Sequence, residues 1–319
     1  MHIALIKTAC ICSMRPPGFD ACAYVLKRTE NFPQNDHSQT MDANFVNSFC
    51  ALEGPYGRIE VLAYSHNLVT HAHSQAQLAF WMGGGSAHAH VAGQRIAFAP
   101  DRALAVNRLG SHDLCLDHAD APAVFLVLYI DDVFLRDCCN RVGDSLVFAS
   151  ASIHLDALAQ SSAVQVMQKV LLPQTSADLP MEADLRSLLA HIVDQAAPPK
   201  PAREVPRLRH LVDYRLRVAM AHMRANVGSP TPTEELAEVV GLSRSRLCAL
   251  FLDELGTSPH VFWNTVRLEA ATQRLNADHA NLTELALDLG FSTSGNFSRF
   301  FREHTGVTPS AYRRYRHAA

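Results

Sequence analysis

The spacing of hydrophobic positions divides the chain into a β-rich part, a short helical part and a wholly helical C-terminal part. Residues 58–130 consist of short apolar or alternating runs separated by glycine, proline and aspartate breaks. Closely spaced runs of this kind predict antiparallel strands in a sandwich or barrel. Over residues 154–195 the apolar positions change to a helical period, and from residue 207 onward the pattern is helical throughout. The pattern therefore predicts an α+β chain with more than one domain.

Two segments without clear periodicity border these regions. Residues 1–50 show no regular pattern and are expected to form a loosely ordered leader. Residues 196–206 contain four prolines in eleven positions, which is typical of a semi-stiff linker. We expect this linker to keep the two cores apart. The expected units are a leader over 1–50, a β domain over 51–150, a helical element over 151–195, the linker over 196–206 and a helical domain over 207–319.

One apolar stripe stands out in the helical element. Leu185, Leu188, Leu189 and Ile192 fall on one face of its second predicted helix. Such a stripe either seals the β domain or pairs two chains. We assign residues 151–195 as a dimerisation element, and sealing of the β domain is the open alternative.

The C-terminal region repeats itself. Residues 235–237 (Glu-Leu-Ala) return as 284–286, and Gly241 and Gly290 stand at equivalent positions in the two copies. Each glycine falls where a helix ends and a left-handed turn residue is required. Each copy is therefore predicted to be a compact helix-turn-helix unit.

The second helix of each copy presents polar and basic side chains opposite a buried apolar stripe. Ser243 and Ser292 are expected to cap these helices, as Thr233 and Thr283 cap the first helices. An arginine on such a face can bind guanine through two hydrogen bonds, and short side chains let a helix sit deep in the major groove. The helix expected over 259–277 joins the two units, and its length can place their two recognition helices in successive major grooves of DNA. The expected DNA-contacting residues are Arg244, Ser245, Arg246, Ala249, Ser294, Gly295, Ser298, Arg299 and Arg302.

These segments resemble the DNA-binding domain of the AraC/XylS family of bacterial transcription regulators. The resemblance runs from about residue 213 to 315 and is densest in ALDLGFSTSGNFSRFFREHTGVTPSAYRR. Two positions depart from the family pattern. Ala249 stands where the family often has a base-contacting arginine, and Ser245 is small where larger residues are common. The first copy is therefore expected to read fewer bases.

The resemblance also implies a role for the whole chain. It implies a cytoplasmic regulator of transcription that binds double-stranded DNA as a homodimer and contacts RNA polymerase. Activation is favoured over repression. A small-molecule effector is expected in a cupin-like N-terminal barrel, and neither enzymatic activity nor a cofactor is implied.

The β domain carries part of a cupin pattern. His71 and His73 alternate on a predicted strand and therefore face the same side. Gln77 follows where the cupin motif has glutamate. We favour a metal-free sensory barrel. The alternative is a metal-sensing regulator, or a cupin metalloenzyme with a DNA-binding tail, in which the metal ligands are His71, His73, Gln77 and His112.

Other polar residues of the β domain are candidates for effector binding. An effector pocket needs an apolar lining with a few polar anchors, and the inward-facing candidates are His73, Trp81, Arg95 and Tyr64. Arg95 could hold a carboxylate or phosphate through two hydrogen bonds, but an exposed hairpin position is equally open for it. His88 and His90 repeat the His-x-His spacing and are expected on a solvent-facing hairpin.

Charge and cysteine content narrow the classes of partner. Residues 207–319 carry 14 Arg and no Lys against 11 Asp and Glu, whereas the whole chain has a net charge of −3. A nucleic-acid partner is therefore expected at the C-terminal end only. The eight cysteines form no CxxC pair, which suits a reducing cytoplasm and excludes a structural zinc site of the paired type. No apolar run approaches the ~20 residues of a membrane span, and no signal peptide is expected.

Overall fold

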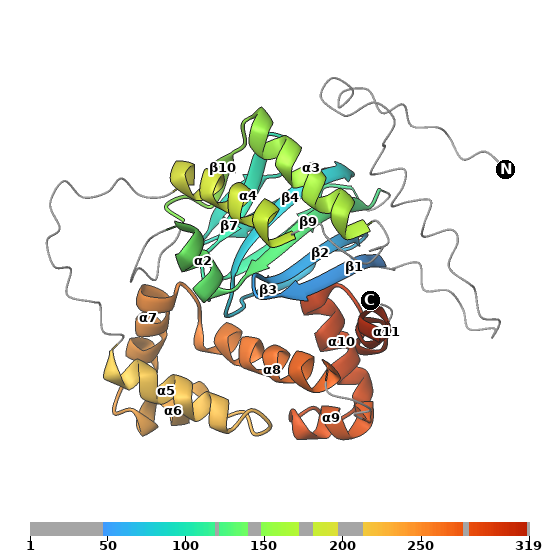
Figure 1. Cartoon of the computed structure of the whole chain (residues 1–319). Coiled ribbons are helices and arrows are strands. Elements are labelled where there is room, and N and C mark those ends of the chain that lie inside the picture. The colour runs from blue at the N-terminus through green and yellow to red at the C-terminus, as the bar shows by residue number, and fades with distance from the viewer. Residues whose placement is uncertain are drawn as a thin grey trace, which may run out of the picture.

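The structure, a computed structural model, describes residues 47–118, 121–139, 148–171, 181–196, 213–276 and 281–317. Figure 1 shows strands covered along one side by helices, with a further group of helices below them. Almost all of the expected leader and linker lies outside the described residues, so both remain predictions. Among the described helices, none is long and apolar enough to cross a membrane.

Within these ranges the strands form two sheets in which every pairing is antiparallel. The larger sheet has the order β1-β2-β9-β4-β7-β10 and the smaller one the order β3-β8-β5-β6. The predicted closed barrel is not confirmed, because no closed sheet is found in the described part of the chain. The strands are β1 (Asn47–Gly54), β2 (Gly57–Tyr64), β3 (Leu68–His71), β4 (Ala76–Gly84), β5 (Ala87–Val91), β6 (Gln94–Ala97), β7 (Arg102–Val106), β8 (His112–Leu116), β9 (Ala123–Ile130) and β10 (Ser152–His154).

The six-stranded sheet is buried on both faces, which explains the near-continuous apolar runs of its central strands β2 and β9. On one face, Val61 and Leu126 pack toward the helices α2 (Asp132–Cys139), α3 (Ala157–Leu171) and α4 (Met181–Ala196). On the other face, Leu62 and Phe125 pack toward the four-stranded sheet. The larger sheet is thus the middle layer of the N-terminal domain.

The apolar stripe of α4 seals this domain. Leu185, Leu188, Leu189 and Ile192 are each 1–2% exposed and belong to the same core as the six-stranded sheet. Residues buried within one chain cannot pair two chains. The sealing alternative therefore holds for this stripe, and a dimerisation role of residues 151–195 through another surface stays a prediction.

The C-terminal region consists of two helix-turn-helix units joined by one long helix (Figure 1). The joining helix has 18 residues, which corresponds to about 27 Å. Gly241 and Gly290 both have positive φ, as the predicted turns require. The helices are α5 (Tyr214–Ala225), α6 (Thr233–Val239), α7 (Arg244–Leu255), α8 (Pro259–Asn276), α9 (Leu282–Asp288), α10 (Ser294–Thr305) and α11 (Pro309–His317).

The helix caps differ in part from the prediction. Ser243 caps α7 as expected, because its side chain accepts a hydrogen bond from the Arg246 N–H. The cap of α9 is Asn281 rather than Thr283, and the cap of α10 is Thr293 rather than Ser292. At α6 the capping position is held by Pro232, which offers no side-chain acceptor, and Thr233 is already helical. The observed cap position lies one or two residues before the expected one at α6 and α9, and one residue after it at α10.

The two helix-turn-helix units differ in what they pack against. The first has its own core, which includes Leu247, Phe251 and Phe262. Phe297 and Tyr312 of the second unit belong to one contiguous cluster with the strands of the N-terminal domain. Strand β3 contacts α8 and α10, and β1 contacts α11. The expectation that the linker keeps the two cores apart is therefore wrong for the second unit.

Candidate nucleic-acid interface

Helix α7 presents the predicted basic face of the first unit. Leu247 and Phe251 are completely buried, four residues apart, and they fix which side of the helix points outward. Arg244, Ser245 and Arg246 are exposed. Of the first copy's predicted contact residues, these three are open to a ligand, whereas Ala249 is half-buried. The Arg244 Nε lies 3.1 Å from a carboxylate oxygen of Glu234, and both side chains are largely exposed, so phosphate can displace this weak pair.

Helix α10 presents the corresponding face of the second unit. Phe297 and Phe301 are fully buried at i and i+4, and Gly295 and Arg299 point to solvent. The remaining predicted contact residues are partly buried, namely Ser294, Ser298 and Arg302. The helix begins at the Thr293 cap, whose hydroxyl accepts from the Asn296 N–H at 3.1 Å.

Asn296 is a candidate that the sequence reasoning missed. It is exposed on the first turn of α10, and its side-chain amide donates to the Ser292 hydroxyl oxygen at 2.8 Å. An asparagine amide can match the hydrogen-bonding edge of adenine. The spacing in the sequence could have identified Asn296, because it precedes Arg299 by three residues and so lies on the same helical face.

A cluster of histidines lies behind α10. His71, His73 and His112 come from or directly follow strands of the N-terminal domain, and the ring centroids of His71 and His112 are 4.3 Å apart. The centroids of His73 and His112 are 5.0 Å apart. His304, in the last turn of α10, places its ring 6.4 Å from that of His71. The recognition helix of the second unit therefore contacts the part of the β domain that carries the cupin-like pattern.

Burial keeps these rings uncharged. Loss of hydration, reinforced by the nearby His73, lowers the pKa of His71 to about 3. Burial also lowers the pKa of His73, of His112 and of His304. The cluster therefore suits neutral imidazoles at physiological pH.

The hydrogen bonds of the cluster do not favour the metal set considered above. Nδ1 of His73 donates to the Gln75 carbonyl oxygen at 2.7 Å, and Nε2 lies 2.8 Å from Gln77 Oε1. Both ring nitrogens of His73 thus face oxygen atoms, so the ring would have to turn before its Nε2 lone pair could reach a cation. Nε2 of His112 is buried and has no hydrogen-bond partner among the residues that the structure describes. The four-residue set does not fit a metal ion in this arrangement.

The other predicted effector residues lie at separate places. Tyr64 is buried in the core beside Phe125, and burial raises its pKa well above the usual value. The indole N–H of Trp81 donates to the Gly85 carbonyl oxygen at 3.0 Å. The side chain of Arg95 is 56% exposed and lies 3.5 Å from Asp117, on the outer face of the smaller sheet. The inward orientation expected for Arg95 is therefore wrong, because its strand alternation places Ile96 in the core instead.

Arg58 is a buried cation that the sequence reasoning missed. Its Nη1 donates to the Tyr312 hydroxyl of α11 at 3.1 Å, and its guanidinium lies 4.2 Å from the centroid of the Tyr129 ring. Its Nε has no hydrogen-bond partner within the described ranges, but it forms an ion pair with Glu60, whose carboxylate oxygen lies 3.4 Å away. A small pocket of about 10 Å³, between the larger sheet and α4, is lined by Arg58 and Tyr129 together with Tyr56 and Leu189. The sequence could not identify Arg58, because a single arginine in a strand produces no periodic pattern.

Three hydrogen bonds join the β domain to the linking helix and the first unit. Thr265 of α8 places its hydroxyl 3.0 Å from the carbonyl oxygen of Ala72, the residue between His71 and His73. The Ser111 hydroxyl donates to the Gly256 carbonyl oxygen at 2.9 Å, and the Ser74 N–H donates to Glu269 at 3.1 Å. The histidine-bearing segment therefore contacts the elements that position both recognition helices.

The C-terminal region of the chain is similar to known helix-turn-helix proteins. Residues 236–315 match a family described as a helix-turn-helix domain. The chain is 32% identical over 97 residues to the raffinose operon transcriptional regulatory protein RafR of Pediococcus pentosaceus, covering 30% of this chain and 35% of RafR. It is 34% identical over 114 residues to an uncharacterized HTH-type transcriptional regulator of Staphylococcus aureus (strain COL), covering 34% of this chain and 15% of that protein. The chain thus spans about a third or less of the length of these relatives, which are described as regulators and not as enzymes.

Two solved structures extend the comparison. An AraC-type DNA-binding domain protein from Chromobacterium violaceum is 35% identical and covers 32% of this chain and 91% of its own, with a TM-score of 0.31. Apo ToxT from Vibrio cholerae strain SCE256 covers 87% of this chain and 99% of its own, with a TM-score of 0.51 and 11% identity. The likeness to ToxT concerns the fold alone.

Proposed function

The chain belongs to the AraC-type helix-turn-helix proteins through residues 236–315, and from this premise we propose that it is a sequence-specific regulator of transcription. One observation carries the proposal. Two helix-turn-helix units, joined by the single helix α8, each expose a recognition helix with arginine on its outer face. This arrangement suits double-stranded DNA, because major-groove readout requires a helix with exposed donors.

The two recognition helices have different roles in the proposed DNA binding. Asn296 and Arg299 of α10 offer side chains that can read adenine and guanine edges, whereas Ser245 and Ala249 of α7 are short. Arg244 and Arg246 lie at the start of α7, where phosphate contact is favourable. We therefore assign most of the base reading to α10 and most of the phosphate anchoring to α7.

Regulation is proposed to pass through the interface between the domains. A small-molecule effector shifts a regulator only if it binds the DNA-competent and the incompetent arrangements with different affinity. The contacts of Thr265 and His304 with the histidine-bearing segment support a coupling route from the β domain to both units. Arg58 is the better candidate than Arg95 for holding an anionic effector, because its side chain is 20% exposed against 56% for Arg95 and it also contacts Tyr312 of α11. An anionic effector would compete with Glu60 for it. His73, Trp81 and Tyr64 remain proposed lining residues.

The finer parts of the proposal concern partners. A homodimer would place four recognition helices on one operator, which would then contain two repeated half-sites. Because the stripe of α4 is buried, pairing must use another surface. We further propose contact with RNA polymerase, activation rather than repression, and action in the cytoplasm, where chromosomal DNA is found.

Selection of bound sequences from random duplex DNA with the full chain tests the proposal. An enriched motif is expected, and Arg299→Ala should weaken binding to it by about 1–3 kcal/mol and relax one base position. Arg217→Ala is the matched control, because Arg217 is also exposed but lies on α5 and not on either recognition helix. Equal weakening on all sequences would assign Arg299 to a phosphate, and the absence of any enriched motif would contradict the proposed function.

A further inference from the structure

The outer face of the four-stranded sheet carries a second cluster of histidines, separate from the one behind α10. On β5, Ala87 and Ala89 are buried, so His88 and His90 both point outward. On β8, His112 and Leu114 face inward. The side chains that face outward on this pair of strands are His88, His90, Asp113 and Cys115.

The pairing of these strands brings the side chains together. His88 stands directly opposite Cys115 in the antiparallel ladder. The ring centroids of His88 and His90 are 5.3 Å apart. One potential ligand atom from each of His88, His90 and Cys115 lies within 4.8 Å of the other two, and this is the one such group of His, Cys, Asp and Glu in the described part of the chain.

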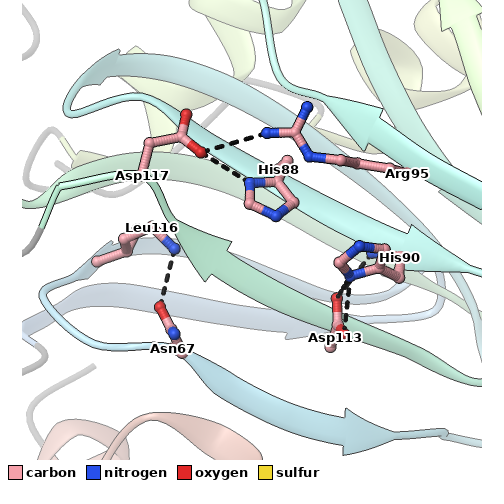
Figure 2. A network of polar contacts seen from close by, with 7 residues as sticks. All are labelled: Asn67, His88, His90, Arg95, Asp113, Leu116 and Asp117. Atoms are coloured by element: carbon pink, nitrogen blue, oxygen red, sulfur yellow. Dashed lines mark hydrogen bonds and ion pairs between the residues drawn. The ribbon is translucent and has the colours of Figure 1, made fainter.

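Each histidine is held by a carboxylate, as Figure 2 shows. Nδ1 of His88 donates to Asp117 at 2.8 Å, and Nδ1 of His90 donates to Asp113 at 3.1 Å. A carboxylate only accepts, so the proton of each ring is fixed on Nδ1 and the lone pair on Nε2. Metal-binding histidines characteristically have this partner, which orients the ring and raises the basicity of the free nitrogen.

We propose that His88, His90 and Cys115 form a binding site for a divalent transition-metal cation of the zinc class. Two imidazole nitrogens and one thiolate form a ligand set that suits Zn²⁺, with a fourth tetrahedral position for water. The site is accessible, because the side chain of His90 is 43% exposed and that of His88 is 15% exposed. On binding, the Cys115 thiol gives its proton to solvent and its sulfur coordinates the cation.

The charges around the site are complementary to such a cation. Asp113, Asp117 and a Cys115 thiolate carry three negative charges, and Arg95 contributes one positive charge through its 3.5 Å contact with Asp117. A divalent cation therefore brings the group to neutrality. This proposal does not rest on the proposed function, because it concerns a face of the sheet that DNA recognition does not use.

Cobalt is the probe for the experiment, because Co²⁺ replaces Zn²⁺ in tetrahedral sites and absorbs light when bound to a thiolate. The full chain, stripped with a chelator, is titrated with Co²⁺. We expect one equivalent to bind with a sulfur-to-cobalt charge-transfer band, which Zn²⁺ then abolishes. Cys115→Ser should remove the band, whereas Cys248→Ser, the control for a thiol elsewhere, should keep it.

Substitutions around the cysteine separate the site from adventitious binding. His88→Gln and His90→Gln should each abolish stoichiometric binding. Asp113→Asn and Asp117→Asn should weaken it by about 10–100-fold, as expected for residues that position a ligand. Asp101→Asn, at another partly exposed acid beside a histidine, should leave the affinity unchanged.

Any of three results would overturn the proposal. One is a full chain that binds no stoichiometric Co²⁺ or Zn²⁺. Another is a charge-transfer band that persists in Cys115→Ser. The third is binding that is lost in His71→Gln while His88→Gln retains it. Circular dichroism of the metal-free variants checks their folding, and the partial exposure of Cys115 and His90 makes these substitutions tolerable.

Discussion

The Thr265 hydroxyl lies 3.0 Å from the Ala72 carbonyl oxygen, and both residues are almost completely buried. Thr265 is in the middle of the helix that joins the two helix-turn-helix units, and Ala72 lies between the two histidines of the cupin-like pattern. The same hydroxyl is 3.0 Å from the Val261 carbonyl oxygen of its own helix. The bond to Ala72 therefore ties the β domain to the element that sets the spacing of the recognition helices.

Thr265→Val should destabilise the full chain by about 1–3 kcal/mol, because valine has the same shape but leaves the buried Ala72 carbonyl without this donor. Thr272→Val is the control in the same helix. The Thr272 hydroxyl bonds only to Leu268 and Glu269 of α8 itself, so its replacement should cost less. Urea unfolding of both variants measures the difference, and equal costs would show that the contact between domains contributes nothing.

Gly290→Ala should be far more damaging than Gly241→Ala, although the two glycines are equivalent in the repeat. Both have positive φ, which costs a non-glycine residue about 1–2 kcal/mol. A Cβ on Gly290 would also lie 2.3 Å from the Gly228 carbonyl oxygen, whereas a Cβ on Gly241 meets nothing within 4 Å. Thermal unfolding should rank Gly290→Ala clearly below Gly241→Ala, and the reverse order would contradict this packing.

Ser243→Ala should destabilise the first unit by about 1 kcal/mol, because the serine caps α7. Thr233→Ala should cost less, since Thr233 lies inside α6 and its side chain caps nothing. Chemical denaturation followed by circular dichroism separates the two. If Thr233→Ala lowers the stability as much as Ser243→Ala does, Thr233 acts as the cap of α6, as the sequence pattern predicts.

Stability should fall as the pH drops below about 6.5, because the buried histidines are neutral in the folded chain. The folded pKa of His71 is about 3, below the ordinary value of about 6.5, so the unfolded chain binds more protons between these two values. The contribution is present above pH 6.5 and is lost progressively toward pH 3, at a slope of up to about 1.4 kcal/mol per pH unit for this residue. His112 and His304 act in the same direction.

Urea unfolding of the wild type across this pH range measures the slope. His71→Gln should make it shallower, because glutamine has no proton to gain on unfolding. His154→Gln, at a side chain that is 74% exposed, controls for the loss of any histidine. An unchanged slope in His71→Gln would contradict the buried, neutral state of His71.

Helices of the C-terminal region were predictable because their signals are local. The joining helix expected over 259–277 is observed as Pro259–Asn276, and the turn glycines and buried phenylalanines of both units lie where the repeat places them. The caps were displaced because Asn281, two residues before Thr283, and Thr293, one residue after Ser292, also offer side-chain acceptors. Sequence pattern alone does not rank neighbouring acceptors.

Pairings between distant segments could not be predicted from periodicity. His88 and His90 do face outward as expected, but their partners Asp113, on β8, and Asp117, directly after β8, lie more than twenty residues away in the chain. Arg95 was a candidate for the interior because alternation does not say which face of a strand is buried. For the stripe of α4, an apolar face looks the same whether it covers a sheet or a second chain, and only the fold decides between them.

Arg58 and its partner Tyr312 on α11 are 254 residues apart in the chain. During synthesis, Tyr312 therefore becomes available to Arg58 only after a delay. A ribosome that adds about 5–20 residues per second needs about 13–50 s to cover this distance. Throughout that time the nascent β domain exposes apolar surface that the second helix-turn-helix unit later covers. Chaperones can bind this surface during the interval. A transcript truncated before α8 would yield a chain whose β domain lacks the contacts of α8, α10 and α11.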